Sequence, residues 1–259
     1  MRLLIYQVDA FTNQLFKGNP AMVVPLGAWI SEGLMQNIAA ENNLSETAFY
    51  VRNGKYFDIR WFTPEVEVDL CGHATLASAF IIFENGEVDD HKVVFHSKSG
   101  VLEVDRTPDG LTIDFPALVP MAIDLPKWIE YIGGNPIEVY NCFDDFLLIY
   151  NSEEEVRELS PNYAALKQVP IRGFICSSRS DKYDFVSRFF APSSGINEDP
   201  VTGSTHTKLI PYWANVLKKD KLFAKQISKR GGELKCELLN KRVKISGNAK
   251  LFLKGEIYI

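Results

Sequence analysis

The chain has little excess charge of either sign and no long apolar run, and both absences limit its partners. Its 259 residues include 28 lysines and arginines and 33 acids, a net charge of −5, so nothing favours nucleic acid or an anionic membrane as a partner. No apolar run approaches the ~20 residues of a membrane helix. A strand-like pattern over Leu3–Asp9 leaves no room for a signal peptide. We therefore expect a cytoplasmic protein.

Cysteine and histidine are scarce as well. The four cysteines show no CxxC spacing and the four histidines do not cluster, so we expect no disulfide framework and no metal site. The sequence has no phosphate-binding glycine-rich loop and no dinucleotide fingerprint, so no cofactor is expected. A serine hydrolase is poorly supported, because the stretch around Ser204 lacks the second glycine of GxSxG.

What the chain does contain is a loop that enters a helix, Asn197–His206. Two acids, a proline and a Gly-Ser pair precede the apolar run Leu209–Leu217. Ser204 or Thr205 is a candidate N-cap. The free N–H groups of a helix start, with the positive end of its dipole, bind carboxylates or phosphates. This stretch is therefore a candidate anion site.

The same arrangement occurs earlier in the chain, so the sequence contains an internal repeat. Cys71-Gly72-His73 opens a second apolar run, Leu76–Phe83. His73 and Ser204 are 131 residues apart (204 − 73), and the serines of two Ser-Lys turns, Ser97 and Ser228, are also 131 apart (228 − 97). Two independent anchors with one offset indicate two copies of one unit.

Each copy reads as strands, one long helix, then more strands. One helix buries such a sheet best when the sheet curls around it. We therefore predict an α+β fold of two pseudo-symmetric domains, each a curled, mostly antiparallel sheet around a central helix. The proline-rich stretch 116–126 is the candidate linker, which gives domains 1–118 and 119–259, with the last strand allowed to return to the first domain.

Six residues are candidates for catalysis or binding. Glu46 is expected to begin a strand on the face of Ala48 and Tyr50; it is either a solvated strand end or a general acid/base with a pKa raised by burial between the domains. Asp199 is either a capping acid or a ligand for a substrate amine or hydroxyl. His73 is either a satisfied capping residue or a second proton carrier. Gly72, Gly203 and Ser204 would bind a substrate carboxylate where the two helix starts face one another across the domain cleft.

Cys71 suggests a rival chemistry. A thiol at a helix start has a lowered pKa, and two facing thiols make a cofactor-independent racemase or epimerase. The repeat partner of Cys71 is Thr202, which cannot exchange a proton with a carbon acid. A two-thiol mechanism is therefore disfavoured. A non-catalytic protein that only binds a small carboxylate at the helix starts is the other alternative.

Five ordered motifs, which together span nearly the whole chain, resemble the phenazine biosynthesis PhzF-like family. The motifs are Asp9-Ala10-Phe11-Thr12, Gly18-Asn19-Pro20-Ala21, Leu44-Ser45-Glu46-Thr47-Ala48-Phe49, Cys71-Gly72-His73-Ala74-Thr75 and Glu198-Asp199-Pro200-Val201-Thr202-Gly203-Ser204. The resemblance implies the diaminopimelate epimerase fold, with the active site between two similar domains. It agrees with the repeat, which was found independently.

The resemblance also implies a function. It implies a cofactor-free isomerase in which one glutamate moves a proton between two carbons of a small-molecule carboxylate, and Glu46 occupies the motif that carries this glutamate. The remaining family positions match residues of this chain as catalytic (His73, Asp199) or substrate-binding (Asn19, Gly72, Gly203, Ser204). A homodimer is a family-level expectation only. The sequence names neither the substrate nor a role in phenazine synthesis.

Overall fold

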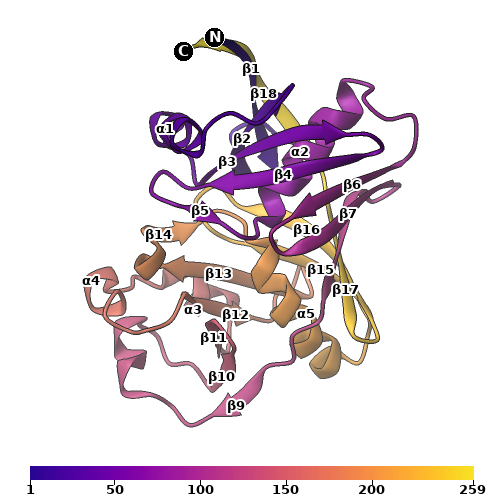
Figure 1. Cartoon of the computed structure of the whole chain (residues 1–259). Coiled ribbons are helices and arrows are strands. Elements are labelled where there is room, and N and C mark those ends of the chain that lie inside the picture. Colours follow the sequence, from indigo (N-terminus) through magenta and orange to yellow (C-terminus); the bar gives the residue numbers. More distant parts are fainter. The chain divides into compact units, whose positions relative to one another are not determined.

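The structure is a computed structural model that describes the whole chain, Met1–Ile259. The chain forms two compact units: unit 1 is Met1–Asp114 with Ile245–Ile259, and unit 2 is Phe115–Lys244. The colour bar of Figure 1 gives the residue numbers by which each unit can be found. Both units combine a sheet with one long helix, so the fold class is α+β, as the sequence predicts. The sequence divides the domains after residue 118, whereas the units change at Asp114 and the chain returns to unit 1 at Ile245.

Unit 1 is a curled sheet around the helix α2 (Gly72–Glu84), which contacts β1, β2 and β3. A shorter helix, α1 (Glu32–Asn42), begins at Ser31, whose Oγ accepts a hydrogen bond from the Leu34 amide as an N-cap should. The strands of unit 1 are β1 (Arg2–Ala10), β2 (Asn19–Leu26), β3 (Glu46–Asn53), β4 (Tyr56–Phe62), β5 (Glu67–Val68), β6 (Lys92–Ser97), β7 (Gly100–Thr107), β8 (Gly110–Pro116) and β18 (Ala249–Tyr258).

Unit 2 repeats this plan around the helix α5 (Gly203–Leu217). Two short helices, α3 (Glu153–Glu158) and α4 (Tyr163–Leu166), take the place of α1, and the 3-10 turns η1 (Lys127–Tyr131) and η2 (Pro192–Ser194) complete the unit. Its strands are β9 (Met121–Ile123), β10 (Glu138–Cys142), β11 (Asp145–Ile149), β12 (Gly173–Ser178), β13 (Phe185–Ala191), β14 (Ile196–Asp199), β15 (Lys221–Gln226), β16 (Gly232–Leu239) and β17 (Arg242–Gly247).

The repeat in the sequence is also a repeat of topology. The strands before and after the central helix run parallel in both units, β4 with β6 around α2 and β13 with β15 around α5. A second parallel pair encloses the smaller helices, β2 with β3 around α1 and β11 with β12 around α3 and α4. Parallel neighbours need a crossover connection, which each helix supplies. The ladders β1–β18, β1–β2, β10–β11, β15–β16, β3–β4 and β6–β7 are antiparallel.

The last strand of each copy lies in the unit formed by the other copy. β9 ends the first copy, yet it belongs to unit 2, where Ile123 pairs with Val139 of β10. β18 ends the second copy, yet it belongs to unit 1, where it pairs with β1 along nearly its whole length. The 131-residue offset matches Met121, where β9 begins, with residue 252 of β18 (121 + 131), so equivalent strands of the two copies join opposite units. Unit 1 therefore combines the start and the end of the chain, whereas unit 2 is the continuous piece Phe115–Lys244.

The N-caps of the two long helices correct one sequence prediction. Thr202, with extended angles of φ −119° and ψ 104°, is the N-cap of α5, and Cys71 holds the same position before α2. Ser204 and Thr205, the predicted caps, lie inside the first turn, where the Thr205 hydroxyl donates back to the Thr202 carbonyl at 2.9 Å. Neither N-cap side chain bonds the helix start, so the first N–H groups are not used by a cap.

A proline inside α5 is accommodated by a contact from the segment after β8. Pro211 has no N–H for the carbonyl of Thr207, four residues earlier, and such a loss destabilises a helix. The Leu118 amide donates to that carbonyl at 2.9 Å, so the freed acceptor is satisfied within unit 2. No helix of the chain has both the length and the hydropathy that crossing a membrane would require.

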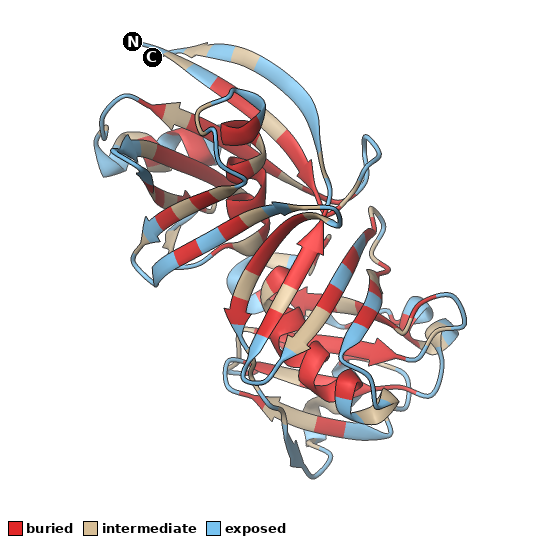
Figure 2. Cartoon of the chain, turned by 90° about the vertical axis from the view of Figure 1, so that its right-hand side faces the viewer, coloured by how far each residue is buried: buried red, intermediate tan, exposed pale blue.

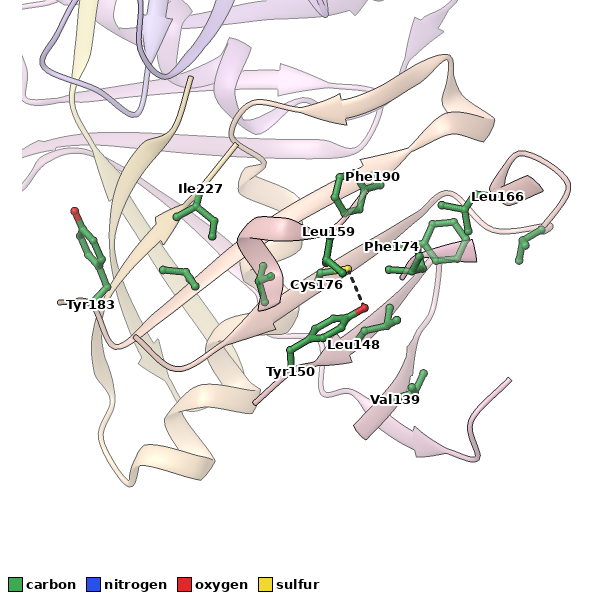
Figure 3. Close-up of a cluster of buried hydrophobic side chains, with 14 residues drawn as sticks. Val139, Leu148, Tyr150, Leu159, Leu166, Phe174, Cys176, Tyr183, Phe190 and Ile227 are labelled. Atoms are coloured by element: carbon green, nitrogen blue, oxygen red, sulfur yellow. Dashed lines mark hydrogen bonds between the residues drawn. The ribbon is translucent and has the colours of Figure 1, made fainter. Parts of the chain in front are cut away.

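Each unit has a buried central helix and a second cluster of buried side chains around its smaller helices. Residues of α2 and α5 are buried almost throughout, as the red central helices of Figure 2 show. On the outer face of the sheet in unit 1, Met35 and Ile38 of α1 pack against Val24 and Phe49. The corresponding cluster of unit 2 is shown in Figure 3, where Cys176 lies beside the Tyr150 hydroxyl, with Sγ 4.0 Å from the oxygen.

Candidate functional site

The predicted site residues, together with polar neighbours that the sequence did not indicate, fall into two groups, one in each unit. The first, which we call the Glu46 group, consists of Asn19, Ser45, Glu46, Cys71 and His73 of unit 1. The second, the Ser204 group, lies in unit 2 and consists of Asp145, Arg172, Asp199, Thr202, Gly203, Ser204 and Lys208. Gly72 is the first residue of α2, as Gly203 is of α5.

The parallel pairing of β2 and β3 brings Asn19 and Glu46 to the same end of the sheet. Glu46 is the first residue of β3, and it pairs with Ala21, two residues after Asn19 begins β2. The turn before Asn19 requires glycine: Gly18 has φ +68°, and a Cβ there would lie 2.1 Å from the Ala10 carbonyl oxygen. The turn at Gly18 thus positions Asn19 at the end of the sheet where Glu46 lies.

His73 lies in the first turn of α2 and is buried against the carboxylate of Glu46. Its Nε2 is 3.3 Å from Glu46 Oε2, and the two side chains are only 6% and 14% exposed. Burial lowers the pKa of His73 to about 3, so its ring is neutral at physiological pH. The contact is close enough for a hydrogen bond but is not aligned as one, and Nε2 has no other hydrogen-bond partner.

The opposite ring nitrogen of His73 is surrounded by Asn19 and Cys71. Nδ1 lies 3.4 Å from Asn19 Nδ2 and 3.4 Å from Cys71 Sγ. The Ser45 hydroxyl donates to Asn19 Oδ1 at 3.1 Å, so the oxygen of that amide faces Ser45 and its nitrogen faces His73. Because an amide NH2 can only donate, Nδ1 of His73 is the acceptor of this pair.

Glu46, Cys71 and His73 also offer three ligand atoms within 4.8 Å of one another. Carboxylate, thiolate and imidazole are donors that zinc accepts. The ring nitrogen beside the thiol, however, is also beside the Asn19 amide, which a coordinated metal would displace. We assign no ion to this group.

In unit 2, the region before α5 is held by hydrogen bonds on both sides of Pro200. The Gln226 amide donates to the Asp199 carbonyl at 2.7 Å and accepts from the Thr202 amide at 2.9 Å. The Thr202 hydroxyl donates to the carboxylate of Asp199, which is 8% exposed. Asp199 is therefore fixed beside the start of α5.

A buried ion network lies next to Ser204. The Arg172 guanidinium makes a bidentate contact with the carboxylate of Asp145, in which Nε donates to Oδ1 at 2.9 Å and Nη2 donates to Oδ2. Lys208 of α5 donates to the same carboxylate. Asp145 is fully buried and Lys208 is 1% exposed. Burial alone would lower the pKa of Arg172, but the attraction of Asp145 outweighs it and raises the pKa above its usual range. The remaining Arg172 nitrogen, Nη1, donates to Ser204 Oγ at 3.1 Å.

Sequence reasoning missed this network. Its one visible signal is Lys208, a cation within the buried part of a helix, where lysine is seldom found without a partner. Nothing in the sequence around Arg172 or Asp145 indicates burial, because each lies at or directly before the start of a strand, where a charged residue is usually exposed in a turn.

The repeat extends to the hydrogen bonds of the two helix starts. Thr75 donates to the carbonyl of the N-cap Cys71 at 2.6 Å, and His206 Nδ1 lies 2.8 Å from the carbonyl of the N-cap Thr202. A carbonyl can only accept, so the Nδ1 of His206 carries the proton. The structure thus contains two buried histidines with opposite hydrogen-bond roles for Nδ1, His73 and His206.

These features define a class: a duplicated α+β protein in which helix starts and polar side chains occupy equivalent places in two units. The fold is shared with a hydroxyproline epimerase from Agrobacterium vitis, which matches 99% of this chain and 92% of its own with a TM-score of 0.64 at 10% identity. That likeness concerns the fold alone.

The family follows from closer matches. The family model described as phenazine biosynthesis-like protein matches residues 8–255, and the chain belongs to this PhzC-PhzF family. A crystal structure of a PhzF family protein from Enterococcus faecalis is 47% identical, with a TM-score of 0.97 over 100% of both chains. A relative from Pseudomonas aeruginosa, named an uncharacterized isomerase, is 50% identical over 258 residues, 99% of each chain.

Proposed function

We propose that the protein is a cofactor-independent isomerase that moves a proton between two carbons of a small carboxylate, with Glu46 as the general acid/base. The observation that carries the proposal is the contact between the Glu46 carboxylate and the neutral ring of His73, 3.3 Å apart and mostly withdrawn from water. Relatives named isomerases support the reaction class.

The reaction needs only one base. The Glu46 carboxylate takes a proton from one carbon of the substrate, the electron pair of that C–H bond moves into the neighbouring unsaturated system, and the protonated Glu46 returns the proton to another carbon. No atom or electron is gained or lost. A carboxylate on a side chain that is only 14% exposed suits both steps, because limited access of water slows loss of the proton between them.

The neutral imidazole of His73 is suited to assist. A protonated ring beside Glu46 would hold the carboxylate as a tight ion pair and weaken it as a base, whereas a neutral N–H donates a hydrogen bond without that penalty. The N–H groups at the starts of α2 and α5, at Gly72 and Gly203, are proposed donors to the substrate carboxylate and to charge that develops during transfer. Asp199 and Ser204 are proposed to bind polar groups of the substrate.

The test is proton exchange with solvent. Purified protein is incubated in heavy water with a panel of a cyclohexadiene carboxylate, a β,γ-unsaturated straight-chain acid and several L-amino acids. Conversion of each compound to an isomer and its deuterium uptake are both followed by NMR, so a proton that is returned without exchange is still detected as turnover. Glu46→Gln, which keeps the size of the side chain, should reduce uptake by at least ~10³-fold. Glu41→Gln, an exposed change at the end of α1, is the matched control. A Glu46→Gln variant that exchanges at the wild-type rate refutes the assignment.

Two other functions are separated by the same panel. A protein that only binds carboxylates would show saturable binding with no deuterium uptake. An epimerase that uses Cys71 would lose exchange when the thiol is alkylated, and it would label the α-carbon of an amino acid. The repeat disfavours the second, because Thr202 occupies the N-cap position that corresponds to Cys71.

A further inference from the structure

Ser45, Asn19, His73 and Glu46 form a chain of side-chain contacts, which we call the circuit. Its two ends, Ser45 and Glu46, are neighbours in the sequence. Ser45 donates to Asn19, Asn19 lies 3.4 Å from Nδ1 of His73, and Nε2 of His73 lies 3.3 Å from Glu46. Because Ser45 and Glu46 are consecutive, both ends of the circuit are fixed by the backbone at the start of β3. Asn19 is completely buried at the first position of β2.

We propose that Asn19, oriented by Ser45, is a positioning residue that holds His73 as the Nε2–H tautomer, so that the neutral imidazole donates to the Glu46 carboxylate. The proposal rests on the proposed role of Glu46 for its consequence in catalysis, but the tautomer itself is a property of the unliganded protein. It assigns Asn19 a role through His73, in place of the direct substrate contact predicted from the sequence.

The physical basis is a count of donors and acceptors. A neutral imidazole carries one N–H and one lone pair. The Asn19 amide nitrogen offers Nδ1 only N–H groups, and the Cys71 thiol at 3.4 Å can also donate, so Nδ1 presents its lone pair to both neighbours and the proton resides on Nε2. Nε2 is buried with no hydrogen-bond partner, and the acceptor within reach is the Glu46 carboxylate. A buried N–H without an acceptor is costly, so a small rotation that completes this bond is favoured.

The reverse tautomer would have an opposite effect. With its proton on Nδ1, His73 would turn a lone pair toward Glu46 at 3.3 Å, which repels a carboxylate and favours the protonated acid. The group would then start the reaction in the wrong protonation state. The orientation of the Asn19 amide, which Ser45 sets, therefore decides whether Glu46 begins as a base.

The decisive measurement is ¹⁵N NMR of histidine-labelled protein without ligand, which distinguishes the two tautomers of a neutral ring. We expect Nε2–H for His73 and Nδ1–H for His206, which serves as the internal reference because its Nδ1 faces a carbonyl. Wild-type protein with Nδ1–H at His73 overturns the proposal. This readout needs no substrate, so it holds even if no compound in the panel exchanges.

Variants connect the tautomer to the reaction. Asn19→Ala and Ser45→Ala should each raise the Nδ1–H population of His73 and lower deuterium exchange by about 10- to 100-fold. Asn42→Ala is the matched control, because the Asn42 amide bonds Thr47 at 3.1 Å and does not take part in the circuit. Should burial prevent Asn19→Ala from folding, the wild-type tautomer and Ser45→Ala decide.

The outcomes also separate this proposal from the proposed function. Unchanged tautomer and exchange in Ser45→Ala and Asn19→Ala would refute the positioning role while leaving Glu46 as the base. Full exchange by Glu46→Gln would refute the proposed function whatever the tautomer of His73.

Discussion

The two buried neutral histidines should make the protein lose stability between pH 7 and pH 5, and His206 is the clearest one to test. It lies within α5 with no exposed surface, and burial lowers its pKa to about 4, although the hydrogen bond to Thr202 partly opposes this. In the unfolded chain the ring titrates near its ordinary value of 6.5. The depressed native pKa stabilises the fold above pH 6.5, and this contribution is lost as the pH falls toward 4.

The size of the effect follows from the two pKa values. From pH 7 to pH 5 the unfolded state takes up most of one proton at His206 while the native state takes up little, which costs about 2 kcal/mol of unfolding free energy. Below pH 4 both states are protonated and the contribution stops changing. His73 adds a loss of the same sign, since its pKa is lowered to about 3.

The assay is urea unfolding of wild type and His206→Asn at pH 7, 6 and 5. Asparagine keeps a donor for the Thr202 carbonyl but cannot titrate, so the free energy should depend less on pH, by about 2 kcal/mol between pH 7 and 5. The smaller side chain leaves a void that lowers stability equally at each pH. His91→Asn, at an exposed ring, is the control. Identical pH dependence in wild type and His206→Asn would show that the reasoning about burial is wrong.

Two further substitutions test the scaffold around the site. Gly18→Ala should destabilise unit 1 by several kcal/mol, because φ is +68° and the new Cβ meets a carbonyl oxygen, whereas Gly33→Ala has free space and should be neutral or stabilising in thermal unfolding. Lys208→Met should destabilise unit 2 by about 3–5 kcal/mol in urea unfolding, since Asp145 is then buried with Arg172 as its remaining cation. A wild-type melting temperature in Gly18→Ala, or a loss under 1 kcal/mol in Lys208→Met, would contradict these expectations.

Much of the fold could be predicted because its signals are local or periodic. The 131-residue offset (204 − 73) identified the duplication, and the structure confirms it: the offset aligns Cys71 with Thr202 as N-caps and Gly72 with Gly203 as first helical residues. Glu46 begins its strand as predicted, because the turn before β3 and the alternation within it are short-range features.

The tertiary structure decided what depends on pairing between distant segments. Strand exchange through β9 and β18 leaves no local pattern, since both strands have the same alternation whichever sheet they join. The network of Arg172, Asp145 and Lys208 forms only when strand and helix pack together. The sequence by itself determined which residue types stand at the helix starts and strand ends. Whether each of these side chains is protonated, and on which atom, depends on its burial and on hydrogen-bond partners far away in the chain, which only the tertiary structure supplies.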